Sequence, residues 1–379
     1  MEHFNLIFSK VPTLRFAEFT DEWEKYELSH FVTRITRRNK NNESSLPLTI
    51  SAQYGLVDQI SFFNKTVASV DLSGYYLLYN GDFAYNKSYS NEYAWGAVKR
   101  LDKYEKGCLS SLYFVFRPND NVDSDYLTHY FESSKWHKGI SNIAGEGARN
   151  HGLLNMAVDD YFATKHCLPS LPEQKKIARF FNAITRRIEI QNKIISKYET
   201  LIKGLCDMIF RYNKSVSLSD LVKCKTSALQ ENMVSTCHRG EYKVLGASGA
   251  IAAIDTYQFE ESGILVLKDG SKAGKIQFAQ GKYSVVGTSV VLIPNEACDA
   301  RYLYFAMSSI DFEKYKVGSG IPHIYFKDYS NERIYYPDKA LRKKITKTLD
   351  FYETMVEIER KMLSAMQKQK AFLLQSMFI

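Results

Sequence analysis

The chain has 379 residues, of which 45% are hydrophobic and 24% are charged, a composition that supports folded cores and excludes a disordered chain. This length corresponds to about two or three domains of ~100–200 residues. No run of about 18 apolar residues occurs, which excludes a membrane-spanning helix, and we expect no signal peptide. The six cysteines lack C-x-x-C spacing, which argues against a zinc site and favours a reducing cytosol.

The net charge of +8 is distributed unevenly along the chain. Residues 1–170 carry −2, residues 171–212 carry +5, residues 213–336 carry +1 and residues 337–379 carry +4. The basic excess therefore lies in two short segments, and the two long segments are nearly neutral. Bulk charge gives little support for nucleic-acid binding, because any polyanion must meet a local patch.

The first long segment has the pattern of a mixed α/β domain with two polar loops. Strands are predicted at 73–79 and 112–117 and a helix at 125–136. The loops, at 80–90 and 145–151, combine glycine with amide, hydroxyl and basic groups, which can approach a DNA backbone or hydrogen-bond base edges. A solvated turn is the alternative for each loop. The candidate DNA contacts of this segment are Arg37, Arg38, Tyr85, Asn86, Lys87, Ser88, Arg149 and Asn150.

Residues 171–212 predict one long helix, with Pro169 and Pro172 at its start. Apolar residues recur in alternating steps of four and three over about five heptads, the a/d pattern of a coiled coil. About 36 unbroken residues would span ~54 Å, more than packing on one domain requires. The predicted seam is Ile177, Phe181, Ile184, Ile188, Gln191, Ile195, Ile202 and Leu205.

The second long segment repeats the mixed α/β pattern. Strands are predicted at 242–245, 263–267 and 283–293, and a helix at 300–315. A loop at 268–275 again follows a strand, and a loop at 318–323 again precedes a long helix. The candidate DNA contacts are Lys225, Lys268, Ser271, Lys272, Lys275, Ser319 and His323.

The chain carries an internal repeat with an offset of 168 residues. At this offset Pro169 aligns with Pro337. The heptad positions of the first helix align with a second set of heptad positions within residues 337–379. Both seams become polar at the equivalent position, Gln191 and Glu359, which we expect to fix the register of a coiled coil. The second seam is Ile345, Leu349, Val356, Glu359, Leu363 and Leu373.

These patterns predict an α+β fold with two pseudo-symmetric mixed α/β domains separated by a long antiparallel two-helix coiled coil. The first helix enters the segment 213–336 and the second leaves it. Because domain termini usually lie close together, the second helix should run back along the first.

The search for catalytic motifs is negative. The segment 270–275 is one residue short of a phosphate-binding loop, and Ile276 stands where that loop needs Ser or Thr. No G-x-S-x-G, H-E-x-x-H or Asn-Pro-Pro-aromatic motif occurs. The sequence therefore gives no catalytic residue and no metal site.

Three segments resemble the specificity subunits of Type I restriction–modification enzymes. They are the opening VPTLRFAEF at 11–19 with the following Trp23 and Glu24, the helix start LPEQKKIA at 171–178, and the closing LLQSMF at 373–378. The second helix departs from the first, since residues 340–342 read Ala-Leu-Arg in place of Pro-Glu-Gln.

The resemblance implies a division of the chain and of the labour. Residues 1–170, with an N-terminal tail, would form target recognition domain 1, residues 171–212 the central conserved helix, residues 213–336 target recognition domain 2, and residues 337–379 the C-terminal conserved helix. Each domain would read one half of a bipartite, asymmetric site in double-stranded DNA, and the paired helices would set the unread gap.

The resemblance also implies that this cytoplasmic chain is non-catalytic and binds no cofactor itself. Two modification subunits would methylate adenine with S-adenosylmethionine. Two restriction subunits can join them and use ATP and Mg for translocation and cleavage. No membrane contact is expected. The alternative that remains open is a coiled-coil scaffold or antirestriction-type protein that binds other subunits without reading DNA.

Overall fold

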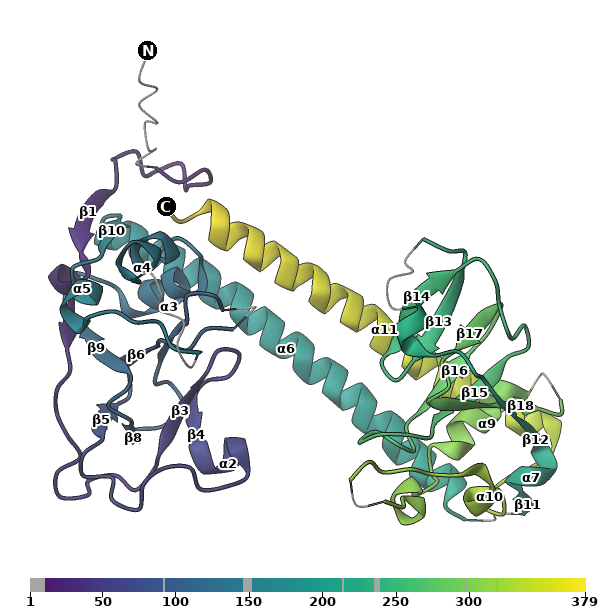
Figure 1. The fold of residues 1–379 in the computed structure, drawn as a ribbon. Helices are drawn as coiled ribbons and strands as arrows, with labels where there is room; N and C mark the ends of the chain where they lie inside the picture. Colours follow the sequence, from purple (N-terminus) through teal and green to yellow (C-terminus); the bar gives the residue numbers. More distant parts are fainter. Residues whose placement is uncertain are drawn as a thin grey trace. The chain divides into compact units, whose positions relative to one another are not determined.

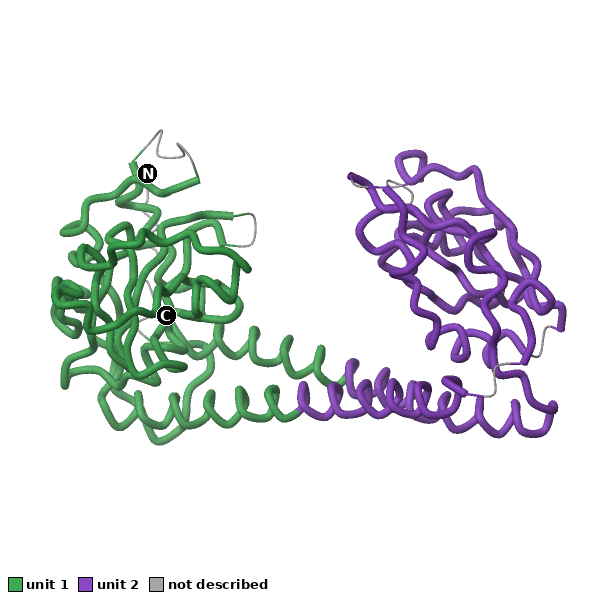
Figure 2. The backbone as a smooth tube through the Cα atoms, turned by 90° about the horizontal axis from the view of Figure 1, so that it is seen from below, with its two compact units in different colours: residues 1–190, 362–379 green, residues 191–361 purple. Residues whose placement is uncertain are grey.

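The computed structural model describes residues 11–90, 93–145, 152–212, 215–234, 239–296, 299–318 and 320–379. The chain divides into two compact units, drawn in two colours in Figure 2. Unit 1 comprises residues 1–190 and 362–379, and unit 2 comprises residues 191–361. Two long helices, α6 (Leu171–Phe210) and α11 (Lys339–Ser376), each contribute residues to both units.

The main sheet of unit 1 has four antiparallel strands in the order β2-β9-β6-β7. The two inner strands, β9 and β6, are labelled in Figure 1. Three two-stranded ladders, β1-β10, β3-β4 and β5-β8, complete the β-structure. The strands are β1 (Glu24–Glu27), β2 (Val32–Arg34), β3 (Leu48–Ser51), β4 (Gly55–Asp58), β5 (Tyr76–Tyr79), β6 (Phe83–Asn86), β7 (Ala97–Arg100), β8 (Lys106–Leu109), β9 (Phe114–Pro118) and β10 (Lys165–Leu168). The short helices are α1 (Leu28–Phe31), α2 (Gln59–Phe63), α3 (Ser124–Glu132), α4 (His137–Ile143) and α5 (Val158–Phe162).

The main sheet of unit 2 also has four antiparallel strands, in the order β12-β18-β15-β16. A three-stranded sheet, β14-β13-β17, and a ladder of β11 with β19 accompany it. The strands are β11 (Val216–Ser217), β12 (Val222–Thr226), β13 (Tyr242–Gly246), β14 (Gly249–Ile254), β15 (Gly263–Leu267), β16 (Ile276–Ala279), β17 (Tyr283–Val285), β18 (Ser289–Pro294) and β19 (Arg333–Ile334). The helices are α7 (Leu218–Leu221), α8 (Glu231–Val234), α9 (Ala300–Met307), α10 (Phe326–Tyr329) and the 3-10 helix η3 (Phe312–Tyr315).

The two main sheets have the same topology. In each, the first strand pairs with the last, the last with the second, and the second with the third. A short helix precedes the first strand in both units, α1 before β2 and α7 before β12, and a longer helix follows the last strand, α3 after β9 and α9 after β18. The internal repeat of the sequence is therefore a repeat of the fold.

The long helices pair antiparallel within each unit. In unit 1 the rings of Phe181 and Phe378 lie 5.6 Å apart, and Lys370 Nζ donates to Thr185 Oγ1 at 2.9 Å. In unit 2 the rings of Tyr198 and Tyr352 lie 6.4 Å apart, and Gln191 Nε2 donates to the carbonyl oxygen of its predicted counterpart, Glu359, at 3.1 Å. In both units, residues with higher numbers on α6 contact residues with lower numbers on α11. The two helices therefore run antiparallel, and the predicted fold class is confirmed.

Burial along both helices follows the predicted heptads. None of the predicted seam residues is exposed: Ile177, Phe181, Gln191, Ile195, Leu349 and Val356 are buried, and the others are half-buried. The core of unit 1 takes in Ile177 and Phe181 of α6 together with Phe378, and the core of unit 2 takes in Phe210 of α6 and Leu349 of α11.

The first turn of each long helix is tied to its domain by a buried polar side chain. In unit 1, Gln174 donates to the carbonyl of Pro169 at 2.9 Å and accepts from the backbone N–H of Asp123, the N-cap of α3, at 2.8 Å. The repeat places Arg342 at the equivalent position of α11. Arg342 donates to the carbonyl of Pro337 at 2.6 Å and holds the carboxylate of Asp299, the N-cap of α9, at 3.0 Å through two nitrogens.

Several expected element boundaries are wrong. The predicted loop at 80–90 contains strand β6, and the predicted strand at 283–293 is broken into β17 and β18. The helix expected over 300–315 ends at Met307, and η3 follows as a separate turn. The helix expected over 125–136 ends at Glu132, because the backbone at Ser133 is extended.

No helix in the described ranges is both long and apolar enough to cross a lipid bilayer.

Candidate nucleic-acid interface

In unit 1 the segment after β6 joins the segment that follows the predicted loop at 145–151. Tyr89 N donates to the carbonyl of Gly152 at 3.1 Å, and Leu154 N donates to the carbonyl of Lys87 at 3.0 Å. Ser88 forms a bridge with Leu153. We call residues 86–90 and 152–154 loop cluster 1.

In unit 2 the segment after β15 joins the predicted loop at 318–323 in the same way. Gly270 N donates to the carbonyl of Pro322, and Ile324 N to that of Lys268, both at 2.9 Å. The ring nitrogen Nδ1 of His323 lies 2.8 Å from Asp269 Oδ1. We call residues 268–275, 317–318 and 320–324 loop cluster 2.

The two clusters lie at equivalent places in their units. Strands β6 and β15 each occupy the inner position between the last and third strands of the main sheet, and each cluster begins where that strand ends. Pairing of two loops that are more than fifty residues apart therefore recurs in each unit.

The side chains of loop cluster 1 are mostly engaged locally. Asn86 accepts from Ser88 N at 2.9 Å, and Lys87 Nζ lies 4.8 Å from the centre of the Phe114 ring. Burial lowers the pKa of Lys87. Of these three side chains only Ser88 is exposed, and Asn86 and Lys87 are half-buried.

The side chains of loop cluster 2 are more cationic and more exposed. Ser271 and Lys272 are exposed, and Lys275 Nζ donates to the carbonyl of Ala247 at 3.2 Å. Gly270 has a φ of 93°, a left-handed conformation that favours glycine and allows the tight turn of the loop. Lys268 is half-buried.

Three residues of unit 1 that were predicted to contact DNA make contacts within their own domain, and burial corrects one of these predictions. Tyr85 cannot meet DNA, because its ring is fully buried, stacks on Tyr161 and donates its hydroxyl to a backbone carbonyl. Arg37 pairs with the buried carboxylate of Asp82 and lies against Tyr79, and Arg38 lies over Tyr76 and donates to the Gly74 carbonyl. Both arginines contact their own domain and are half-buried, and their contact with DNA stays a prediction.

The remaining predicted contacts lie apart from the clusters or outside the described residues. Lys225 lies on β12 and pairs with Glu261 at 3.3 Å. Arg149, Asn150 and Ser319 are outside the described residues.

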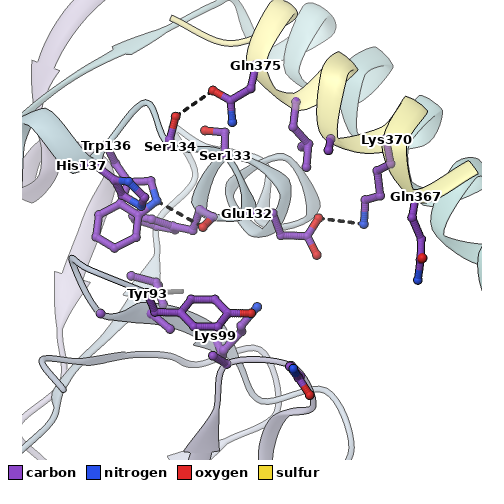
Figure 3. A pocket seen from close by; sticks show the side chains of 18 of the residues that line it. Tyr93, Lys99, Glu132, Ser133, Ser134, Trp136, His137, Gln367, Lys370 and Gln375 are labelled. Atoms are coloured by element: carbon purple, nitrogen blue, oxygen red, sulfur yellow. Dashed lines mark hydrogen bonds and ion pairs between the residues drawn. The ribbon is translucent and has the colours of Figure 1, made fainter. Parts of the chain in front are cut away.

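A hollow of about 670 Å³ opens in unit 1 beside loop cluster 1. Strand β7, the residues after α3 and the last turns of α11 form its walls (Figure 3). Tyr93 and Lys99 lie across from Glu132 and Lys370 (Figure 3). The sequence gives no signal for this site, because Lys99 occurs in a short strand beside Arg100 without any motif.

Lys370 and Glu132 form an ion pair in the hollow, and Lys99 is a second cation there. Lys370 pairs with Glu132 at 2.9 Å. Burial opposes ionisation of Glu132, but the hydrogen bond with His129 and the charge of Lys370 lower its pKa to about 2. Burial lowers the pKa of Lys99, and this lysine makes no hydrogen bond with any residue in the described ranges.

The described residues contain no group of three or more metal-ligating side chains that could hold an ion. Cys108, Cys167, Cys206 and Cys224 form no disulfide in the part of the chain that the structure describes. The loop clusters and the hollow carry hydrogen-bonding groups and charged side chains.

Residues 212–367 match the family model of the Type I restriction modification DNA specificity domain. The chain is 28% identical over 122 residues to the Type I restriction enzyme MjaVIII specificity subunit of Methanocaldococcus jannaschii. That match spans 31% of this chain and 28% of the relative's length.

Two solved structures share the fold along almost the whole chain. The S subunit of a type I restriction–modification system from M. genitalium matches with a TM-score of 0.59 and 15% identity, over 97% of this chain and 99% of that one. A chain from work on complex assembly and conformational transition of the type I R-M system matches with a TM-score of 0.55 and 15% identity, over 93% and 96%. The resemblance read from the three sequence segments is thereby confirmed: residues 212–367 match the Type I specificity domain model, and the chain shares the fold of these two solved structures.

Proposed function

We propose that this chain recognises a bipartite, asymmetric sequence in double-stranded DNA and directs adenine methylation and restriction by partner subunits. One observation carries the proposal: units of the same topology each present a loop cluster at the end of the equivalent strand, with different side chains. Similar scaffolds with unlike surfaces suit two unlike half-sites on one duplex.

The division of labour follows from the same proposal. Residues 1–170 and 213–336 act as target recognition domains, and the helices within 171–212 and 337–379 act as the spacer that sets the unread gap. The chain itself catalyses no step and binds no cofactor. Two modification subunits supply adenine methylation with S-adenosylmethionine, and two restriction subunits can add ATP- and Mg-dependent cleavage in the cytoplasm.

Selection from random DNA tests the proposal. The assembly of this chain with its modification partner is mixed with a pool of random duplexes, and the bound molecules are sequenced. We expect enrichment of two fixed segments that flank a gap of fixed length and free sequence, and no enrichment by the modification partner alone. Equal recovery of all sequences would instead favour a scaffold that does not read DNA.

Methyl transfer by the isolated chain tests the division of labour. Incubation of the chain with DNA and S-adenosylmethionine should leave the DNA unmethylated, whereas the assembly with the modification partner should methylate it. Transfer by the isolated chain would place a catalytic site in this polypeptide.

A further inference from the structure

We infer that the hollow of unit 1 binds a phosphate group of the DNA backbone, with Lys99 as the residue that holds it beside loop cluster 1. The inference rests on the proposed function and deepens it, because none of the contacts expected from the sequence lies in this hollow. Contacts to phosphates fix the position of a protein on a duplex, whereas contacts to bases provide the sequence preference.

The hollow is lined by hydrogen-bond donors that have no acceptor among the described residues. The amine of Lys99, the hydroxyl of Tyr93, the ring of His137 and the amide of Gln367 all line it. Among the residues that the structure describes, none of these four side-chain groups has a hydrogen-bond partner. Burial lowers the pKa of His137, which favours a neutral ring with one N–H to donate. Donors without a partner, placed around one hollow, are groups from which the oxygens of a phosphate can accept hydrogen bonds.

The single carboxylate in the hollow is already neutralised. Glu132 accepts from Lys370 and interacts with His129, so its charge is matched within unit 1. The amine of Lys99 is then a surplus positive charge in a half-buried setting, where a phosphate gains more from a cation than it does in open solvent.

The hollow is continuous with loop cluster 1. Ala97, which lines the hollow, pairs directly with Asn86 at the start of the cluster. Tyr93 also lines the hollow, and its backbone exchanges hydrogen bonds with Ser90 at the end of the cluster's first segment. A duplex whose bases meet loop cluster 1 therefore has backbone close to Lys99.

Unit 2 provides an internal comparison. A hollow of about 540 Å³ there is lined by the helix positions that the repeat predicts, with Val356 for Ile188 and Ile202 for Lys370. Carboxylates stand where unit 1 has neutral amides: Glu199 replaces Gln367, and Asp207 replaces Gln375. Lys203 and Arg360 also line the hollow of unit 2, and Arg360 pairs with Glu199. Four carboxylates there outnumber these two cations, so the hollow of unit 2 suits an anion less well than that of unit 1.

The test measures how the affinity of the assembled complex for its duplex depends on salt. Lys99→Gln should weaken binding about fivefold to tenfold at 0.1 M salt, and should reduce the slope of log affinity against log salt by about 0.9, the value for one lost phosphate contact. The loss should be the same for a specific and a non-specific duplex. Lys99→Arg, which keeps the charge, should retain most of the affinity and the slope.

Matched variants in the two hollows sharpen the test. Gln367→Glu gives unit 1 the charge that Glu199 has in unit 2, and should weaken DNA binding. The reverse change, Glu199→Gln, should leave both affinity and slope as they are. Thermal melting of each variant identifies any loss that comes from unfolding, and Lys99→Arg then remains the informative comparison.

Each other outcome overturns the inference. An unchanged slope for Lys99→Gln, in a wild-type assembly that binds DNA with sequence preference, leaves the proposed function standing and removes Lys99 from the interface. Weaker assembly with the modification partner at unchanged slope would assign the hollow to an acidic protein segment. Saturation of the hollow by micromolar inorganic phosphate would assign it to a free ligand. A wild-type assembly that binds no DNA would overturn both proposals.

Discussion

The two long helices begin in the same way with different chemistry. Gln174 and Arg342 occupy equivalent positions, and each connects the carbonyl of the preceding proline to the N-cap residue of the helix after the main sheet. In unit 1 the connection is between neutral groups, whereas in unit 2 it is an ion pair between Arg342 and Asp299, both nearly buried.

The difference shows what the repeat preserves. The position of the helix relative to its own domain is kept, and the residue that fixes it can change when its partner changes. The same holds for the loop clusters and the hollows, where equivalent backbone carries unlike side chains. Buried connections are thus free to change chemically as pairs, and exposed groups are free to change singly.

The largest expected effect separates the two helix starts. Arg342→Ala leaves the carboxylate of Asp299 buried without its partner and should lower the free energy of unfolding by about 3–5 kcal/mol. Gln174→Ala removes neutral hydrogen bonds and should cost about 1–3 kcal/mol. Urea denaturation of the full chain measures both. Equal losses would show that the ion pair and the neutral connection are energetically alike.

The next largest expected effect is a loss of stability of unit 1 at low pH. His166 lies buried in unit 1 between Tyr130 and Thr164, and burial lowers its pKa from 6.5 to about 4. The unfolded chain then binds more protons between pH 6.5 and 4, so the free energy of unfolding falls as pH is lowered through this window. The loss approaches about 3 kcal/mol at pH 4.

His166→Gln provides the control, because its side chain does not titrate. The variant should show a flatter dependence of stability on pH between 6.5 and 4. Among the described residues of unit 2 no histidine is buried. Hydrogen exchange measured as the pH is lowered should therefore show that unit 1 opens before unit 2. Earlier opening of unit 2 would contradict this assignment.

A smaller effect separates the two loop clusters. Lys272→Ala in loop cluster 2 should weaken binding to the preferred duplex on the order of tenfold if the lysine contacts a base, and should relax sequence preference in one half-site only. Selection of random duplexes by the variant assembly measures this. Relaxation of both half-sites, or of neither, would contradict separate reading by the two units.

Replacement of both residues of the polar pair in the helix seam should have the smallest net effect. Gln191 is buried and donates to Glu359, so replacement of Gln191 alone by Leu leaves a carboxylate against an apolar neighbour and should destabilise the chain by about 1–3 kcal/mol. Replacement of both residues by Leu should restore or raise stability by about 1 kcal/mol. Urea midpoints for the single and double variants check the sign.

The sequence predicted the fold well where period and repeat were strong. Heptad spacing over 171–212 and 337–379 indicated two long helices, and the offset of 168 residues aligned their starts and seams, because an unbroken pattern of apolar side chains determines which face is buried. The four-residue strand β6 escaped detection, because a tyrosine and an asparagine in a glycine-bounded segment also suit a loop.

The candidate site was less predictable. The loops that form each cluster could be picked out by composition, but their pairing across more than fifty residues depends on sheet order. Tyr85 shows the limit most clearly: its phenol suits a base contact, yet it lies on β6, an inner strand whose two faces are both buried. Lys99 carries no local signal, because only the fold brings β7 and α11 around one hollow.

The most direct measurement maps the DNA sequence recognised by a chain with matched insertions. One heptad inserted after Gln191 and one after Glu359 lengthen both helices by about 10 Å, or about three base pairs. Methylation mapping in a host that carries this chain and its modification partner should give the same two half-sequences with a longer gap. An unchanged gap, or a single contiguous recognised sequence, would contradict the account of two readers separated by a helical spacer.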